Sequence, residues 1–197
     1  MVRERVVPIG LVIAVLAGWL LWVTRAPAEA ADISAQLTRA AAAEKAGNHE
    51  AAIDALEQAL ESVRVEAPLV VKPFLVVARP AKFYGDYTPR ANAVFTGSEE
   101  QQYYLEPKNL ISRMASGSYE PAFEVDLQVL TADGNPVASQ PRFGSFRLPA
   151  KSPVYDIYMN LKVTLEGAPA GNYNVRFIVR DLNSKKTATV TQRITIK

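Results

Sequence analysis

The feature that most constrains this fold is an alternation of apolar and polar side chains over residues 153–197. A period of two places successive side chains on opposite faces of an extended strand, so each segment offers one face to a core and one to water. Three segments show the pattern, with the apolar rows Tyr155-Ile157-Met159-Leu161-Val163-Leu165, Tyr173-Val175-Phe177-Val179 and Ala188-Val190-Gln192-Ile194-Ile196. Turn-forming residues at 167–171 and 183–186 separate them. We expect these three strands to form one antiparallel sheet.

Further strands are predicted between residues 69 and 148. Their ranges are 69–78, 99–106, 122–130 and 141–148. Pro107 is expected to end the second strand, and a turn at residues 133–136 to end the third. A long connection rich in aromatic residues, 81–97, follows the first. The sequence therefore predicts a mainly β fold, an Ig-like antiparallel β-sandwich of about seven strands over residues 67–197.

Residues 1–30 have the pattern of an export segment. Arg3 and Arg5 precede a stretch, residues 6–24, that contains no charged side chain, and small residues follow at 26–30. This matches a cleaved signal peptide, but a helix of that length at ~1.5 Å per residue also nearly spans the ~30 Å core of a bilayer. Both alternatives place the remainder in the periplasm or cell envelope, and an uncleaved segment 6–24 would anchor it in the inner membrane.

The period changes to that of a helix in residues 31–66. Apolar side chains recur on one helical face before and after a break at Gly47-Asn48: Ile33, Leu37, Ala40, Ala41, then Ile53, Leu56, Leu60, Val63. This predicts an antiparallel helical hairpin. Residues 46–60 resemble the second half of a tetratricopeptide repeat. One such repeat cannot bury a core by itself, so its apolar side must lean on the sandwich, on a partner or on another copy of the chain.

Four acidic residues of the second helix fall on one stripe: Glu50, Asp54, Glu57 and Glu61. Two interpretations stay open, a docking face for a basic partner and a solvated helix face. Residues 26–66 carry eight acids and three bases, whereas residues 67–197 carry sixteen bases and eleven acids. No dense Lys/Arg stripe is present, so nucleic acid is not an expected partner.

Several short segments resemble an uncharacterised family of exported proteobacterial proteins. They are Phe83-Tyr84-Gly85-Asp86-Tyr87-Thr88-Pro89-Arg90, Val94-Phe95, Gly97-Ser98-Glu99, Tyr103-Tyr104-Leu105-Glu106-Pro107, Pro169-Ala170-Gly171-Asn172-Tyr173 and Arg180-Asp181-Leu182-Asn183-Ser184-Lys185-Lys186. Members of this family combine a signal segment, a short helical pair and a β-sandwich. The chain departs from the family pattern by inserting Ser98. The resemblance implies an Ig-like sandwich and an envelope location, and it implies no activity.

The sequence lacks most of the residue types and motifs that usually perform catalysis. The chain has no cysteine and one histidine, His49, which excludes disulfides and any zinc site built from Cys and His. Neither Cys/His nor Ser/His/Asp machinery has an obvious basis, and no phosphate-binding loop is present. We therefore expect no enzymatic activity, no catalytic residues, no metal and no cofactor.

The best candidate binding surface combines the loop 83–90 with the strand around residues 103–107. Its residues are Tyr84, Asp86, Tyr87, Arg90, Tyr103, Tyr104 and Glu106. Tyr and Arg are favoured at binding surfaces. The alternative is structural: Tyr87, Phe95 and one of Tyr103 and Tyr104 close the end of the sandwich, while Arg90 pairs with Glu106 or Asp86 as a latch.

Two functions fit these observations. The first is a non-enzymatic interaction or scaffolding protein of the envelope, for instance an accessory subunit of a membrane-associated complex, with other envelope proteins as partners. The second is a sandwich that binds glycan or peptidoglycan, with Tyr84, Tyr87 and Tyr104 as stacking platforms. In the first, partners would use the acidic helical face, a sheet edge or the 83–90 loop, whereas the second predicts an exposed row of aromatic rings. The oligomeric state stays open.

Overall fold

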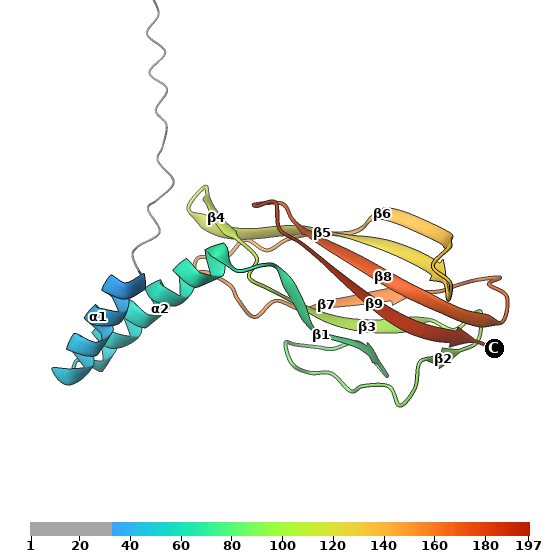
Figure 1. Cartoon of the computed structure of the whole chain (residues 1–197), viewed down its shortest axis with the longest axis horizontal. Coiled ribbons are helices and arrows are strands. Elements are labelled where there is room, and N and C mark those ends of the chain that lie inside the picture. Colours follow the sequence, from blue (N-terminus) through green and yellow to red (C-terminus); the bar gives the residue numbers. More distant parts are fainter. Residues whose placement is uncertain (1–32) are drawn as a thin grey trace, which may run out of the picture. The chain divides into compact units, whose positions relative to one another are not determined.

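A computed structural model describes residues 33–197 of the chain (Figure 1). The described residues form one compact unit. The predicted export or anchor segment, residues 6–24, lies outside the described residues. Within the described part, no helix is long and apolar enough to cross a membrane.

The described chain begins with two antiparallel helices, α1 (Ile33–Lys45) and α2 (His49–Glu66). Gly47 adopts a positive φ of 73°, which ends α1 because glycine tolerates this left-handed conformation. Asn48 caps α2, since its side-chain oxygen accepts a hydrogen bond from the Ala51 amide at 3.1 Å. The Gly47-Asn48 pair therefore makes the turn that the sequence predicts.

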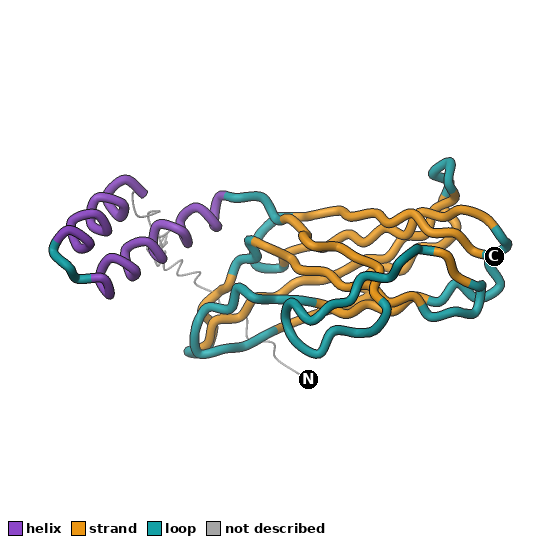
Figure 2. The backbone as a smooth tube through the Cα atoms, turned by 90° about the horizontal axis from the view of Figure 1, so that it is seen from below, coloured by secondary structure: helices purple, strands orange, loops and turns teal. Residues whose placement is uncertain are grey.

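The remaining residues form two facing sheets, so the fold is a mainly β sandwich (Figure 2). The small sheet has the order β1-β3-β7. The large sheet has the order β2-β9-β8-β5-β4, and β6 also pairs with β5. All pairs are antiparallel except β2 with β9. The strands are β1 (Val70–Val77), β2 (Val94–Phe95), β3 (Gln101–Lys108), β4 (Ser112–Ala115), β5 (Ser118–Thr131), β6 (Pro136–Arg147), β7 (Met159–Val163), β8 (Gly171–Asp181) and β9 (Thr187–Ile196).

The core forms where the apolar rows of the two sheets meet. The row predicted on β8 is buried throughout: Tyr173, Val175, Phe177 and Val179. Phe177 of the large sheet packs edge-to-face on Tyr103 of the small sheet, with ring centroids 5.1 Å apart. The period-two prediction is confirmed for these residues, and the same row on β9 ends in the buried pair Ile194 and Ile196.

The prediction that the last three strands share one sheet is wrong. β7 pairs with β3 in the small sheet, whereas β8 and β9 belong to the large sheet, so residues 164–170 cross from one sheet to the other. Alternation reports which face of a strand is buried and carries no information on which strand lies beside it. β7 is also shorter than predicted, because residues 153–158 have no regular structure and Tyr155 is exposed.

Other bounds also differ from prediction, since β5 begins at Ser118 instead of residue 122 and β6 at Pro136 instead of residue 141. Pro107 lies inside β3, opposite Val71 of β1, instead of ending the strand. β7 pairs with β3 only as far as Leu105, so one edge of β3 is unpaired at Pro107 and its missing N–H is tolerated. The short strand β4, not predicted, joins β5 through Ser116 and Gly117, which both have positive φ (49° and 73°), as tight hairpin turns require.

A loop covers the outer face of the small sheet. After β1 the chain folds back, and Ala81 joins Val77 and Tyr104 in a second buried cluster on this face, with Leu75 and Tyr158 packed against it. The small sheet therefore has the main core on one side and this loop on the other. The arrangement determines what the predicted binding surface can do.

Candidate interaction surface

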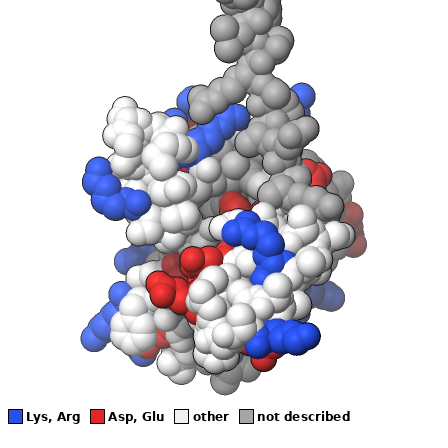
Figure 3. All heavy atoms as spheres, turned by 90° about the vertical axis from the view of Figure 1, so that its left-hand side faces the viewer, with Lys and Arg blue, Asp and Glu red and all other residues white. Residues whose placement is uncertain are grey.

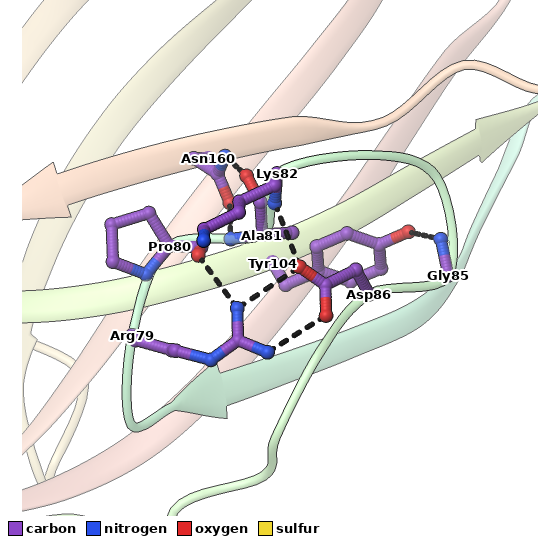
Figure 4. A network of polar contacts seen from close by, with 8 residues as sticks. All are labelled: Arg79, Pro80, Ala81, Lys82, Gly85, Asp86, Tyr104 and Asn160. Carbon is purple, nitrogen blue, oxygen red and sulfur yellow. Dashed lines mark hydrogen bonds and ion pairs between the residues drawn. The ribbon is translucent and has the colours of Figure 1, made fainter.

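A polar network holds the loop after β1 in place (Figure 4). The Arg79 guanidinium donates two hydrogen bonds to the Asp86 carboxylate, at 2.9 and 2.7 Å, and the Lys82 amide donates a third at 3.0 Å. The hydrogen bonds from Arg79 and then Lys82 hold the pKa of Asp86 well below its usual range. The Asn160 side chain of β7 makes two hydrogen bonds to the backbone of Ala81, at 2.9 and 2.8 Å.

A second contact joins the same loop to β3 through buried groups. The Tyr104 hydroxyl donates to Oε1 of Glu106 at 2.7 Å and accepts from the Gly85 amide at 2.8 Å. Lys108 donates to Oε2 of Glu106 at 2.7 Å, contacts the Tyr84 hydroxyl and lies over the Tyr84 ring. Burial alone raises the pKa of Glu106, but the hydrogen bonds from Lys108, Tyr104 and Tyr84 outweigh burial and bring it below its usual value.

These contacts form a latch between loop and strand, with a different cation from the one predicted. We expected Arg90 to pair with Glu106 or Asp86. Instead Arg90 donates to Glu99 at 2.6 Å and to the Val94 carbonyl at 3.0 Å. Sequence reasoning did not identify Arg79, Lys108 or Asn160. Lys108 stands two residues after Glu106, so the period of a strand places both on one face and could have revealed the pair.

The latch leaves little of this region free to bind a ligand. Tyr103 and Tyr104 have no exposed surface, because one lies in the main core and the other beneath the loop. Tyr84 is half-buried, and Tyr87, whose ring packs on Tyr104 at 4.8 Å between centroids, is 36% exposed. The predicted stacking role of Tyr104 is therefore wrong, and the predicted row of exposed rings is absent among these residues.

The helical hairpin presents a different kind of surface, because its helices meet through small side chains. Ala40 of α1 and Ala52, Ala55 and Ala59 of α2 are buried, together with Gln36. Alanine extends no further than its Cβ atom, so the two helices lie close together without using their larger side chains.

The large apolar side chains of the hairpin are exposed. Four of those on α2 that share one helical face are 46–55% exposed, Val65 near its end is 44% exposed, and those of α1 are 39% and 49% exposed. The four are Ile53, Leu56, Leu60 and Val63. We call these six residues the apolar face: Ile33, Leu37, Ile53, Leu56, Leu60 and Val63. Monomeric proteins rarely expose contiguous apolar patches of large side chains unless something binds there.

Helix geometry places all six side chains on one side of the hairpin. At 3.6 residues per turn, the apolar residues of each helix lie roughly 60–90° around the axis from its buried residues, in the same rotational sense on both helices. In an antiparallel helix pair, turning in the same rotational sense about each helix axis, starting from the contact between the helices, leads to the same side of the hairpin. The apolar face is therefore one surface built from two ridges, one on each helix.

The predicted acidic stripe borders the apolar face on the side of α2 away from α1. Glu50, Asp54 and Glu57 are exposed and make no ion pair with any residue between 33 and 197. Glu61, at the end of the stripe, is half-buried and accepts a hydrogen bond from the Tyr155 hydroxyl at 2.8 Å. In Figure 3, acidic side chains gather near the middle of the view, with uncharged surface and basic side chains beside them.

A cavity of about 410 Å³ lies where the end of α2 meets the sandwich. Leu60 and Val63 of the apolar face line it, together with residues 107–110 and 154–157. The Arg64 guanidinium stacks 3.7 Å from the centre of the Tyr155 ring, and Lys186 donates to the Arg64 carbonyl at 2.8 Å. These contacts hold the end of α2 against the sandwich. The cavity is continuous with the apolar face because Leu60 and Val63 belong to both.

Comparison with known proteins shows only distant likeness. The sequence matches no protein-family model and no curated protein. Among solved structures, a Niemann-Pick type C2 protein from Japanese carpenter ant aligns with a TM-score of 0.44 and 13% identity, over 66% of this chain and 94% of that chain. Spo0M, a sporulation control protein from Bacillus subtilis, aligns with a TM-score of 0.36 and 12% identity, over 66% of this chain and 50% of that chain.

Proposed function

We propose that this chain is a non-enzymatic interaction protein of the bacterial cell envelope. In this proposal the apolar face of the hairpin docks another protein, and the sandwich, of the immunoglobulin-like kind, is the rigid platform that carries the hairpin. The observation that carries the proposal is the exposure of six large apolar side chains on an element whose own contacts use alanine.

The location rests on the amino-acid pattern of residues 1–30. Two arginines, a long uncharged stretch and a run of small residues are typical of export, whether the segment is cleaved or stays in the inner membrane. The partners we propose are other envelope proteins. A glycan-binding role would rest on Tyr84 and Tyr87 alone, and no observation favours it.

Site-specific photocrosslinking in source cells tests the docking face. A photoreactive phenylalanine analogue at Leu56 should give a discrete adduct with another protein, and Leu60→Ser in the same chain should remove that adduct. The matched control places the analogue at Gln58, which is also exposed on α2 but faces away from the apolar face. Equal adducts from both positions, or none from Leu56, would refute the proposed function.

A further inference from the structure

We propose that the occupant of the apolar face is a basic amphipathic α-helix, which lies along α2 with its cationic side chains beside the acidic stripe. This inference rests on the proposed function and specifies the partner. Its three supports are the shape of the face, its charge and the cavity at the end of α2.

The shape of the apolar face suits a helix. Ile53, Leu56, Leu60 and Val63 recur every three or four residues, so they form a ridge along the axis of α2. Ile33 and Leu37 form the second ridge on α1. The groove between two such ridges is the geometry in which a third helix packs, by laying its own apolar stripe between them.

The negative charge of the hairpin favours a positively charged partner. Residues 33–66 contain six acidic and three basic side chains. Glu50, Asp54 and Glu57 stand at spacings of three and four residues, where like charges repel one another, and cations placed beside them relieve that repulsion. A second copy of the hairpin is itself acidic, so it offers a surplus of acids and not of cations, and an anionic membrane would be repelled. A helix with lysine or arginine on the flank that faces the stripe places cations beside Glu57 and Glu50, the two of these acids that helix geometry puts nearest the ridge.

The cavity gives the docked helix an end point. Leu60 and Val63 belong both to the apolar face and to the cavity wall, so a helix that follows α2 reaches the cavity at its end. Pro107, Leu110 and Ile157 supply apolar wall opposite α2. We therefore expect a large apolar side chain near one end of the partner helix to enter the cavity and set its register along α2.

The test uses residues 31–197, the compact unit that contains all the described structure. Three synthetic helical peptides of about 18 residues, the length of α2, carry one identical leucine stripe and differ only in their flanks, which are lysine, glutamine or glutamate. Fluorescence anisotropy measures each affinity at about 20 and 300 mM salt, where screening differs strongly. The lysine peptide should bind tightest and weaken with salt, and the glutamate peptide should bind weakest.

Charge reversal on the protein should change this order. Glu57→Lys should weaken the lysine peptide about threefold to tenfold and strengthen the glutamate peptide, as expected for one or two exposed charge pairs. Glu166→Lys is the matched control, because Glu166 is exposed in the connection between β7 and β8. It makes the same change in net charge and should leave both affinities within about twofold. Circular dichroism confirms that each variant keeps its helices.

Each other outcome overturns the inference. If all three peptides bind equally and Leu56→Ser abolishes binding, the face docks a helix without reading its charge, and only the proposed function survives. Dimerisation through Leu56 in sedimentation experiments would assign the face to a second copy, and binding to anionic vesicles would assign it to a lipid surface. If the lysine peptide does not bind at all, the inference fails, and if Leu60→Ser also leaves the crosslink from position 56 unchanged, the proposed function fails with it.

Discussion

Glu106 offers the sharpest test of the latch that closes the loop over the small sheet. Its side chain accepts from the fully buried Tyr104 hydroxyl at 2.7 Å and from Lys108 at 2.7 Å. Replacing it by alanine removes a charge-assisted hydrogen bond to a buried donor, which costs about 1.5–3 kcal/mol. The Lys108 side chain is 32% exposed, so water compensates it and its bond adds less than about 1 kcal/mol. Glu106→Ala should therefore lower the free energy of unfolding by about 2–4 kcal/mol.

Urea unfolding of residues 31–197, followed by far-ultraviolet circular dichroism, measures this change. Tyr104→Phe removes the same hydrogen bond from its other end, so the two substitutions should not add. Their double-mutant cycle should give a coupling energy of about 1–2 kcal/mol. Glu166→Ala, at an exposed carboxylate, is the control and should cost less than about 0.5 kcal/mol. A coupling energy indistinguishable from zero would show that the latch contributes nothing and would refute this reasoning.

Three other perturbations follow from the described contacts. Asp126 accepts hydrogen bonds from Arg180, which hold the pKa of Asp126 below its usual value. The stabilisation from the ionised carboxylate is therefore present at neutral pH and is lost as pH falls through the folded-state pKa. The urea midpoint should fall on acidification, and it should fall less steeply in Asp126→Asn. Asp181 is buried at the end of β8 and accepts three hydrogen bonds from the chain around it, at 2.7–2.9 Å, so Asp181→Ala should lower the unfolding free energy by about 2–4 kcal/mol in the same assay. Ala55→Leu should overpack the contact between the helices and cost about 1–3 kcal/mol, whereas Leu56→Ala one residue later should cost less than about 1 kcal/mol; equal losses in helical signal would contradict the exposure of Leu56.

Short-range sequence patterns correctly predicted the features that depend only on neighbouring residues. The buried row of β8, the turn at residues 133–136 and the Gly47-Asn48 break all follow from side-chain period or turn chemistry within a few residues. The sheet that β7 joins depends on its pairing with β3, more than fifty residues away, and the sequence has no local signal for that pairing. The strand β4 is short and half polar, so its period gives no signal either.

The candidate site shows the same division. The sequence located the latch region, because Tyr104, Glu106 and Asp86 lie in a short span rich in polar and aromatic residues. It assigned the wrong cation, because Arg79 and Lys108 lie just outside the two segments considered. It also located the apolar row of the hairpin. Whether that row is covered depends on which residues form the contact between the helices, and only the structure shows that alanines form it.

The alanine contact has a consequence for the energetics of docking. A helix pair joined through methyl groups gains little from its own burial, so α1 should open far more often than β8, which lies between β5 and β9 in the large sheet. Amide hydrogen exchange in α1 should accordingly be fast in the free protein and slow once the apolar face is occupied. A partner that covers this face then supplies much of the stability of the hairpin, and the affinity measured for docking includes the work of ordering the two helices.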